Sequence, residues 1–232
     1  MIKKQSNVLV LDTETTGNFN CPLVYDFGYI IKDKNFNEIV RRNWLVKEIW
    51  ETEFLMNSAY YISKKPLYEN MVANEEIEVL PLREIIKIWI KDMQQYKVKT
   101  VAAYNISFDD RALTKTIGLC GSDLLEKLNK VLDSRNKLCL QNLAVDSIVQ
   151  LPEYEQFCLK HDLFTNSGRC SMKAENVYRY VIQDAEFEES HTALDDAKIE
   201  FEIMEYICNN CNGRLNYGIF YNTWQKVGVV KK

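Results

Sequence analysis

Short apolar runs separated by polar turns dominate the first half of the chain. Residues 7–12 form a continuous apolar run that is too short for a helix and is typical of a buried strand. The runs at 23–32 and 38–46 are rich in β-forming residues and flank the polar segment 33–37, which predicts a hairpin. A further run at 98–104 predicts another strand. These runs together predict a mixed sheet.

Helical spacing appears between these runs and after them. The clearest case is 81–96, where Pro81 takes the expected first position and apolar residues recur every three or four places. Asn105 is expected to cap a helix that runs to about Ile117, with Gly118 at its end. Further helices are predicted at 124–132, at 153–160, at 171–181 with Ser171 as its cap, and at 192–208. The alternation of strands and helices predicts an α/β fold.

Three segments give weaker patterns. Residues 47–74 predict two short helices that cover the candidate site, in a segment broken at Pro66. Residues 138–148 are ambiguous, and we expect a short strand around 143–145 that leads into a helix or a turn. The segment 209–232 is polar and aromatic and is expected to pack as an irregular C-terminal extension.

Composition limits the class of protein. The chain has 232 residues, of which 47% are hydrophobic, so it can bury a sizeable core. Its 8 glycines and 4 prolines leave no room for a flexible linker, which favours one domain over residues 1–232. No apolar run approaches the ~20 residues that span a bilayer, and the start of the chain shows no signal-peptide pattern. We therefore expect a cytoplasmic protein without membrane contact.

Cysteine and charge narrow the picture further. The seven cysteines are an odd number in a chain without a secretion signal, so they are expected to be reduced thiols. Their spacing with His161 is too irregular to favour a zinc site. The net charge is −4, and the sequence shows no broad basic stripe. A protein that held nucleic acid along its length by charge alone would need such a stripe. Any nucleic-acid substrate is therefore expected to be gripped near one end.

Four acidic residues lie near the ends of predicted strands or the starts of predicted helices. Asp12 and Glu14 come at the end of the first strand, and if strand geometry continues through them, both side chains point to one face. Asp109 lies in the early turns of the helix after the 98–104 strand. Asp196 lies at the start of the last long helix, five residues after His191. For Asp12 and Glu14 alone, a surface turn is the competing interpretation, since Thr-Thr-Gly follows them.

Four carboxylates and one histidine at element boundaries favour metal-assisted phosphoryl transfer. Two divalent cations can activate a water and stabilise the leaving oxygen in the hydrolysis of a phosphodiester. Such hard cations prefer oxygen ligands, which the carboxylates would supply. A neutral His191 could accept a proton from the water, because its ordinary pKa lies near the working pH.

The same residues resemble the three motifs of the DnaQ-like exonucleases of the DEDDh type, the family of proofreading subunits, RNase T and oligoribonuclease. The first motif matches Asp12-Thr-Glu14-Thr-Thr-Gly17, and the second matches Asn105-Ile-Ser-Phe108-Asp109. The third matches His191-Thr-Ala-Leu-Asp-Asp196-Ala197. Asp195 leaves the register of the last acid open, and the resemblance favours Asp196.

The resemblance implies a ribonuclease H-like fold with a mixed, roughly five-stranded sheet flanked by helices. It implies a 3′→5′ exonuclease that acts on single-stranded DNA or RNA 3′ ends and releases nucleoside 5′-monophosphates. It assigns two divalent ions, Mg²⁺ or Mn²⁺, to Asp12, Glu14, Asp109 and Asp196, and the general base to His191. The residues expected to bind the terminal nucleotide are Thr13, Thr15, Thr16, Asn105 and Phe108.

Several alternatives stay open. An endonuclease of the ribonuclease H type would share the carboxylates but has no need of His191. A proofreading subunit that mainly docks on a DNA polymerase could use the aromatic residues of 209–232. The pairs Tyr60–Tyr61 and Tyr178–Tyr180 are expected to be core residues rather than base-stacking ones. Glu188–Glu189 is expected to lie in a solvated loop, with an influence on the metal site as the alternative. The choice between DNA and RNA, and the oligomeric state, are left open by the sequence.

Overall fold

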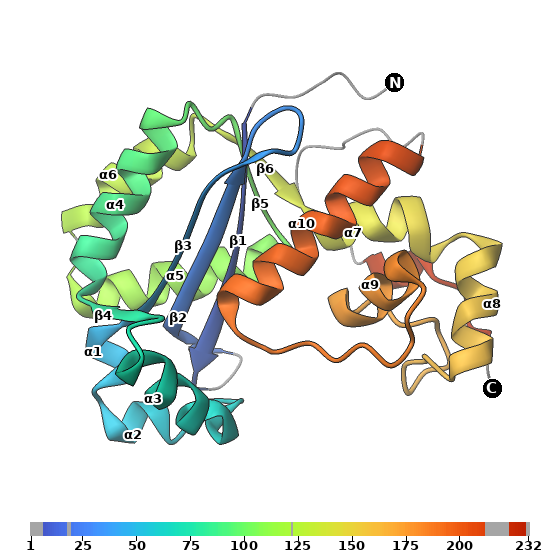
Figure 1. Cartoon of the computed structure of the whole chain (residues 1–232), viewed down its shortest axis with the longest axis horizontal. Helices are drawn as coiled ribbons and strands as arrows, with labels where there is room; N and C mark the ends of the chain where they lie inside the picture. The colour runs from blue at the N-terminus through green and yellow to red at the C-terminus, as the bar shows by residue number, and fades with distance from the viewer. Residues whose placement is uncertain (1–6, 18–19, 122, 212–222, 231–232) are drawn as a thin grey trace.

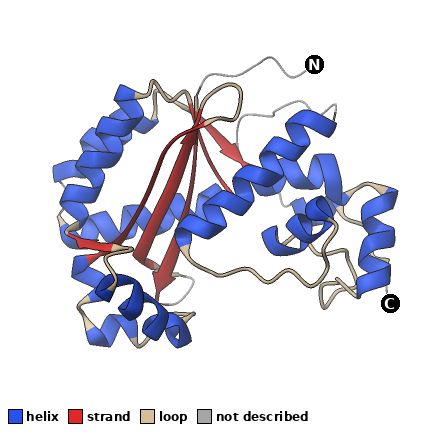
Figure 2. Cartoon of the chain, viewed as in Figure 1, coloured by secondary structure: helices blue, strands red, loops and turns tan. Residues whose placement is uncertain are grey.

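A six-stranded mixed sheet forms the centre of the computed structural model, which describes residues 7–17, 20–121, 123–211 and 223–230. Helices cover both faces of this sheet (Figures 1 and 2). The strands are β1 (Val8–Thr16), β2 (Leu23–Lys32), β3 (Glu38–Val46), β4 (Glu78–Leu80), β5 (Thr100–Ala103) and β6 (Asn136–Cys139). Their order across the sheet is β4-β3-β2-β1-β5-β6.

The predicted hairpin is confirmed, and β1 lies inside the sheet. β2 pairs antiparallel with both β1 and β3, whereas β5 pairs parallel with β1 and β6. Along β1 the side chains alternate: Leu9 and Leu11 belong to one hydrophobic cluster, and Val8 and Val10 belong to the other. The end of β1 therefore presents consecutive side chains to two different helical layers.

The two clusters correspond to the two helical layers. α4, α5 and α6 pack on one face of the sheet, and α7, α9 and α10 lie on the other (Figure 1). The helices are α1 (Lys47–Trp50), α2 (Glu53–Met56), the 3-10 helix η1 (Ile62–Lys64), α3 (Lys65–Ala73), α4 (Leu82–Gln95), α5 (Ile106–Cys120), α6 (Asp123–Leu132), α7 (Leu140–Ala144), the π-helix η2 (Val145–Val149), α8 (Pro152–His161), α9 (Ala174–Ile182), α10 (Ala193–Asn210) and the 3-10 helix η3 (Thr223–Lys226).

The sheet differs from the sequence expectation in two places. β4 was not expected; it is a three-residue edge strand that pairs parallel with β3, too short to give a pattern. The strand expected around 143–145 is wrong, because β6 ends at Cys139 and residues 140–149 form α7 and η2. Leu143, Ala144 and Val145 are all buried there, and a run of consecutive apolar residues does not distinguish a buried helix from a strand.

Several helix ends also differ. Pro81 occupies the cap position of α4 rather than its first turn, and α5 continues through Gly118 to a cap at Gly121 (φ 132°). Ser171 does not cap α9, which begins after Lys173; its hydroxyl instead accepts a hydrogen bond from the Asn176 amide. Such ends depend on tertiary contacts that a sequence pattern does not contain.

The segment 47–74 contains four short helical pieces, α1, α2, η1 and α3, in place of the two expected helices. Pro66 was expected to break a helix, but it lies in the first turn of α3, where its missing N–H costs no hydrogen bond. This segment packs below the end of β1 in Figure 1.

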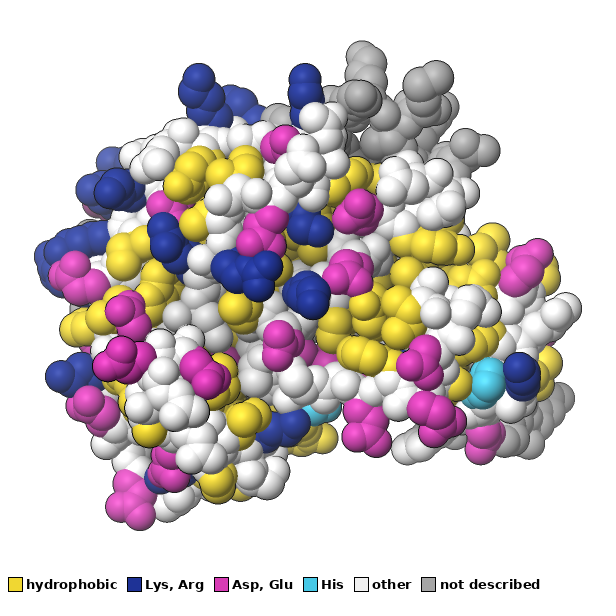
Figure 3. Space-filling view, in the orientation of Figure 1, with side chains coloured by type: hydrophobic (Ala, Val, Ile, Leu, Met, Phe, Trp, Pro, Cys, Tyr) yellow, Lys and Arg dark blue, Asp and Glu magenta, His cyan; other side chains and the backbone are white. Residues whose placement is uncertain are grey.

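Of the extension 209–232, residues 212–222 and 231–232 lie outside the described residues, so the proposed polymerase-docking role of this segment stays a prediction. Of the remainder, residues 209–210 are the end of α10, and residues 223–230 contain η3 and one antiparallel bridge between Arg169 and Val229. Lys and Arg side chains are scattered between acidic ones over the face in Figure 3, without a basic stripe. Within the described residues, every helix is too short or too polar to cross a membrane.

Candidate active site

The end of β1 carries the first two acids. β1 continues as a strand through Thr16, so Asp12 and Glu14 share a side with Val8 and Val10 and face the layer that contains α10. The surface-turn interpretation is therefore wrong. Glu14 is only 7% exposed, which is unusual for a carboxylate without a cationic partner.

A glycine and an acid on β2 bring the start of α10 onto the sheet. Gly28 pairs with Asp12 across the ladder, and a Cβ atom at Gly28 would lie 2.5 Å from the backbone nitrogen of Leu194. A carboxylate oxygen of Asp26 accepts a hydrogen bond of 2.9 Å from the backbone N–H of Ala193. The first turn of α10 is thus held against β1 and β2, and Asp196 lines the same cavity as Asp12.

Asp109 reaches the same place from the opposite layer. Asn105 occupies the cap position of α5 with a left-handed backbone (φ 101°), and its side chain makes no cap hydrogen bond, contrary to expectation. Asp109 follows in the first turn and is 4% exposed. The Thr13 hydroxyl donates a hydrogen bond of 2.8 Å to Asp109. Because Thr13 points to the α5 layer, it joins this helix to the strand that carries Asp12.

One cavity of ≈ 370 Å³ brings the predicted residues together. Its lining includes eight of the ten sequence-predicted site residues, namely Asp12, Thr13, Glu14, Asn105, Phe108, Asp109, His191 and Asp196. Thr15 and Thr16 are not among its lining residues, and Thr16 is fully buried. The expectation that the Thr16 side chain binds a nucleotide does not fit this burial. Asp195 is exposed, which supports Asp196 as the acid of the third motif.

The cavity also contains several residues that the sequence patterns do not predict. Those with polar or aromatic side chains that bear on the chemistry are Tyr61, Lys173, Glu175, Glu189 and Glu200. Glu200 had a detectable signal, since it lies four residues after Asp196 on the same helix and must share its face. Glu189 lies two residues before His191 in the sequence, whereas Tyr61, Lys173 and Glu175 come from segments that the tertiary fold brings near the site.

Burial and mutual repulsion dominate the electrostatics of the cavity. Burial, followed by the charge of Asp196, raises the pKa of Glu14 to about 10. Burial and the charge of Glu189 raise the pKa of Asp196 to about 9, and burial raises the pKa of Asp109 to about 7. Burial and the charge of Glu200 raise the pKa of Asp12 well above its ordinary value. Burial and the neighbouring negative charges thus disfavour the ionised form of each carboxyl group, and a bound cation would favour it.

The donor set fits a hard divalent cation. Ligand atoms of Glu14, His191 and Asp196 lie within 4.8 Å of one another, and this group contains no cysteine. The Oδ1 atom of Asp196 is buried without a hydrogen-bond partner. A buried carboxylate oxygen of this kind needs a donor or a cation, and oxygen-rich sites suit Mg²⁺ and Mn²⁺.

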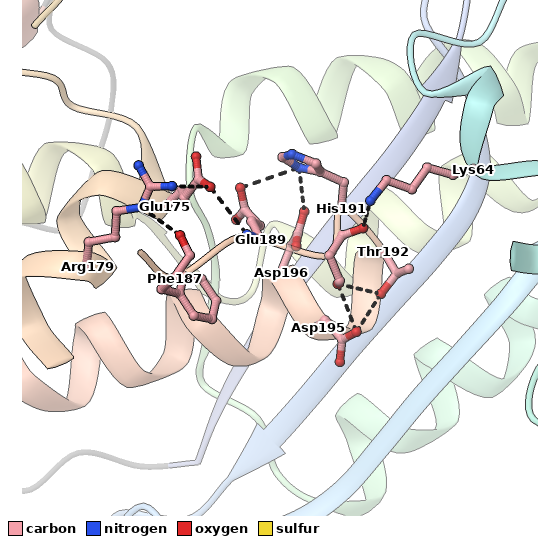
Figure 4. A network of polar contacts seen from close by, with 10 residues as sticks. Lys64, Glu175, Arg179, Phe187, Glu189, His191, Thr192, Asp195 and Asp196 are labelled. Atoms are coloured by element: carbon pink, nitrogen blue, oxygen red, sulfur yellow. Dashed lines mark hydrogen bonds and ion pairs between the residues drawn. The ribbon is translucent and has the colours of Figure 1, made fainter. Parts of the chain in front are cut away.

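His191 lies on a loop held by contacts from three elements (Figure 4). Its backbone is left-handed (φ 53°), and its Nδ1 atom lies 3.4 Å from Glu189 and 3.9 Å from Asp196. Lys64 donates a hydrogen bond of 2.6 Å to the Ser190 carbonyl. Burial, followed by the charge of Lys64, lowers the pKa of His191, which favours the neutral imidazole.

Glu189 and Tyr61 line the cavity, whereas the sequence predicts a solvated loop for Glu189 and a core position for Tyr61. Glu188 is exposed as expected, but the Glu189 side chain is 10% exposed and lines the cavity, so the solvated-loop interpretation is wrong for Glu189. The Glu189 backbone N–H donates to Glu175 on α9, which fixes this part of the loop. Tyr61 stacks on the His191 ring, with ring centroids 4.3 Å apart and an interplanar angle of 13°.

Comparisons with known proteins give a fold. No protein-family model matches the chain, and no curated protein matches its sequence. Escherichia coli exonuclease I in complex with a dA16 oligonucleotide is 14% identical with a TM-score of 0.52, over 88% of this chain and 41% of that chain. The exonuclease in an ExoI/SSB-Ct complex is 14% identical with a TM-score of 0.55, again over 88% of this chain and 41% of that chain. Exonuclease I from Methylocaldum szegediense is 16% identical with a TM-score of 0.53, over 89% of this chain and 41% of that chain.

The chain spans 41% of the length of these three exonucleases. At this identity the likeness concerns the arrangement of the sheet and helices. The expected fold class is confirmed: the chain has an α/β, ribonuclease H-like fold, built on a mixed sheet of six strands rather than five.

Proposed function

We propose that this chain is a metal-dependent 3′→5′ exonuclease of the DnaQ-like, DEDDh type that acts on single-stranded nucleic acid. One observation carries the proposal. Asp12, Glu14, Asp109, Asp196 and His191 come from three separate motifs, and all five line one cavity. Their raised carboxyl pKa values and the unpartnered Asp196 oxygen support a site for cations.

Asp12, Glu14, Asp109 and Asp196 would hold two divalent cations, Mg²⁺ or Mn²⁺. When bound there, the cations would polarise the phosphodiester and stabilise the leaving 3′ oxygen. The carboxylates fix this geometry because they project from a strand and two helices rather than from loops. Thr13 supports Asp109 through the hydrogen bond between its hydroxyl and the carboxylate.

His191 acts as the general base in this proposal. Its lowered pKa keeps the imidazole neutral at ordinary pH, so a ring nitrogen can accept a proton from the attacking water. Glu189, 3.4 Å from Nδ1, can stabilise the imidazolium that forms. Tyr61 limits the movement of the ring by stacking on it.

The terminal nucleotide would bind against Asn105, Phe108 and the backbone around Thr13. Phe108 and Asn105 line the cavity, and an aromatic ring beside the metal site offers a stacking surface that tolerates any base. Lys173 is the lysine of the lining and suits a phosphate. Thr15, two residues after Thr13 on β1, remains a proposed contact, whereas Thr16 is buried.

Directionality and end preference test this function. A 5′-labelled oligonucleotide with a free 3′ end should be shortened stepwise with release of nucleoside 5′-monophosphates, whereas a 3′-phosphate should slow the reaction strongly. A circular strand should stay intact while its linear form is degraded. Equal rates for free and blocked 3′ ends, or cleavage of the circle, would contradict the proposal. Matched DNA and RNA oligonucleotides in the same assay define the substrate class.

A further inference from the structure

Glu200 is one of three carboxylates that line the cavity outside the three motifs, together with Glu175 and Glu189. It lies on α10 one turn after Asp196, so both side chains project from the same face of the helix. It is 3% exposed and lines the same cavity as Asp12 and Asp109. A glutamate buried to this degree normally has a cationic partner.

The contacts of Glu200 do not neutralise its charge. Its Oε2 atom accepts a hydrogen bond of 3.0 Å from the backbone N–H of Tyr104, which is a neutral donor. None of the ion pairs between described residues includes Glu200, although α10 does pair Glu205 with Lys32. A buried carboxylate held by one neutral donor is costly unless it loses its charge or gains a cation.

Five of the acidic residues of the cavity, together with His191, fall into two groups. Glu14, Asp196 and His191 form the first, with ligand atoms within 4.8 Å of one another. Asp12, Asp109 and Glu200 form the second group: they line the same cavity and project from β1, α5 and α10. Burial, followed by the charge of Asp109, raises the pKa of Glu200. The unpartnered, buried Oδ1 atom of Asp196 is an independent sign that the cavity holds a cation.

We propose that Glu200 is a metal ligand that, with Asp12 and Asp109, holds the second of two divalent cations in the protein without substrate. This inference deepens the proposed function and rests on its two-cation site. A third carboxylate in this group would satisfy the cation with protein oxygens where a substrate phosphate would otherwise be needed. The hydrogen bond from Tyr104 orients the Glu200 carboxylate, as is usual for metal ligands.

Glu200→Gln tests this role, because glutamine keeps the size of the side chain and an oxygen acceptor for the Tyr104 N–H. The measurement is a Mn²⁺ titration of the full chain without substrate, in which electron paramagnetic resonance counts the free ion. The parent is expected to bind two Mn²⁺ ions. The variant is expected to bind one, or to bind the second at least tenfold more weakly. Glu205→Gln on the same helix is the matched control and should bind two.

Two further measurements exclude a purely structural role. Glu200→Asp keeps the charge and should bind the second Mn²⁺ more tightly than Glu200→Gln does. The thermal melt of metal-free Glu200→Gln should be equal to or above that of the parent, since a buried charge has been removed. Two Mn²⁺ ions of parental affinity in Glu200→Gln would overturn the inference, and so would a Glu200→Asp that binds no better than Glu200→Gln.

The same titration separates this inference from the proposed function. If the parent binds two Mn²⁺ ions and Glu200→Gln loses one, the inference stands even when no oligonucleotide is hydrolysed. If the parent and Glu200→Gln both hydrolyse 3′ ends and bind two ions, the nuclease assignment stands and the role of Glu200 is overturned. A parent that binds no Mn²⁺ overturns both.

Discussion

The carboxylates and the histidine of the candidate site are positioned in different ways. Asp12, Asp109 and Asp196 project from β1, α5 and α10, which are regular elements packed into the two hydrophobic clusters. His191 lies outside any element, on a backbone with φ 53°. It is held by side-chain contacts with Tyr61 and Glu189 and by the bond from Lys64 to the neighbouring carbonyl.

The proposed cation ligands are therefore held more rigidly than the proposed base, His191. Packed elements keep the carboxylates fixed, as a cation cage requires, although their mutual repulsion opposes it. A loop held by a ring stack and a few hydrogen bonds opens at a lower free-energy cost than a core helix does. Changes to the carboxylates should therefore abolish the site, whereas changes around His191 should weaken it in graded steps.

The largest effect is expected for Asp12→Asn. It removes one carboxylate from the centre of the cage and should lower hydrolysis by about 10³-fold or more, since the cations contribute several kcal/mol to the transition state. Rates with saturating Mg²⁺ measure this effect. Asp110→Asn, an exposed carboxylate that pairs with Lys137, is the control and should be unchanged. Parental rates for Asp12→Asn would remove the two-cation proposal.

His191→Ala should reduce the rate by about 10²–10⁴-fold, the range of general-base catalysis, with little change in metal affinity. The parental rate should fall on the acid side, where the imidazole is protonated, and the difference from the variant should shrink as pH rises. Rates from pH 6 to 9 measure both trends. The chain has two histidines, so His161→Ala on α8 is the matched control. Parallel pH profiles for parent and His191→Ala would rule out His191 as the base.

The contrast between the two regions also explains how far the sequence could predict the site. Asp12 and Glu14 lie at the end of an apolar run that predicts a strand. Side chains two residues apart on a strand point to the same face, so the sequence alone predicts that these two share a face. The surroundings of His191 could not be read, because Tyr61 and Lys64 are more than a hundred residues away along the chain. Similarly, β4 pairs with β3 across an intervening helical segment and carries only three residues.

The stability of the metal-free protein should fall as pH rises, because the buried carboxyl groups of the cavity have raised pKa values. The carboxyls of Asp109 and Glu189, with pKa values of about 7, and of Asp196, at about 9, titrate near 4 when unfolded. Between these values the folded state holds more protons, so stability is greatest below the unfolded pKa and falls as pH rises. Each extra proton makes the unfolding constant rise about tenfold per pH unit.

Thermal melts from pH 5 to 8 check this dependence. Without divalent cations the melting temperature should fall across the range. With saturating Mn²⁺ the fall should be smaller, because the cation favours the ionised carboxylates that it binds. A melting temperature that is constant or rises from pH 5 to 8 without metal would contradict the buried acidic cage.

The smallest effect is expected for Tyr61→Ala, which removes the ring stacked on His191. An aromatic pair contributes about 0.5–1.5 kcal/mol, so kcat should fall about 2- to 12-fold, with KM less affected. Tyr61→Phe keeps the ring and should retain the parental rate. Tyr60→Ala removes an 83% exposed ring that touches Tyr61 only at its edge, and it should have the weaker effect of the two alanine variants.

A readout independent of activity separates positioning from general destabilisation. Loss of the stacked ring in Tyr61→Ala should shift the ring proton signals of His191 in NMR spectra and leave those of His161 unchanged. In the His191→Ala background, Tyr61→Ala should cause no further loss of rate, because the two residues act through one contact. Additive losses in that double variant would show that Tyr61 acts on the substrate or the fold instead of on the base.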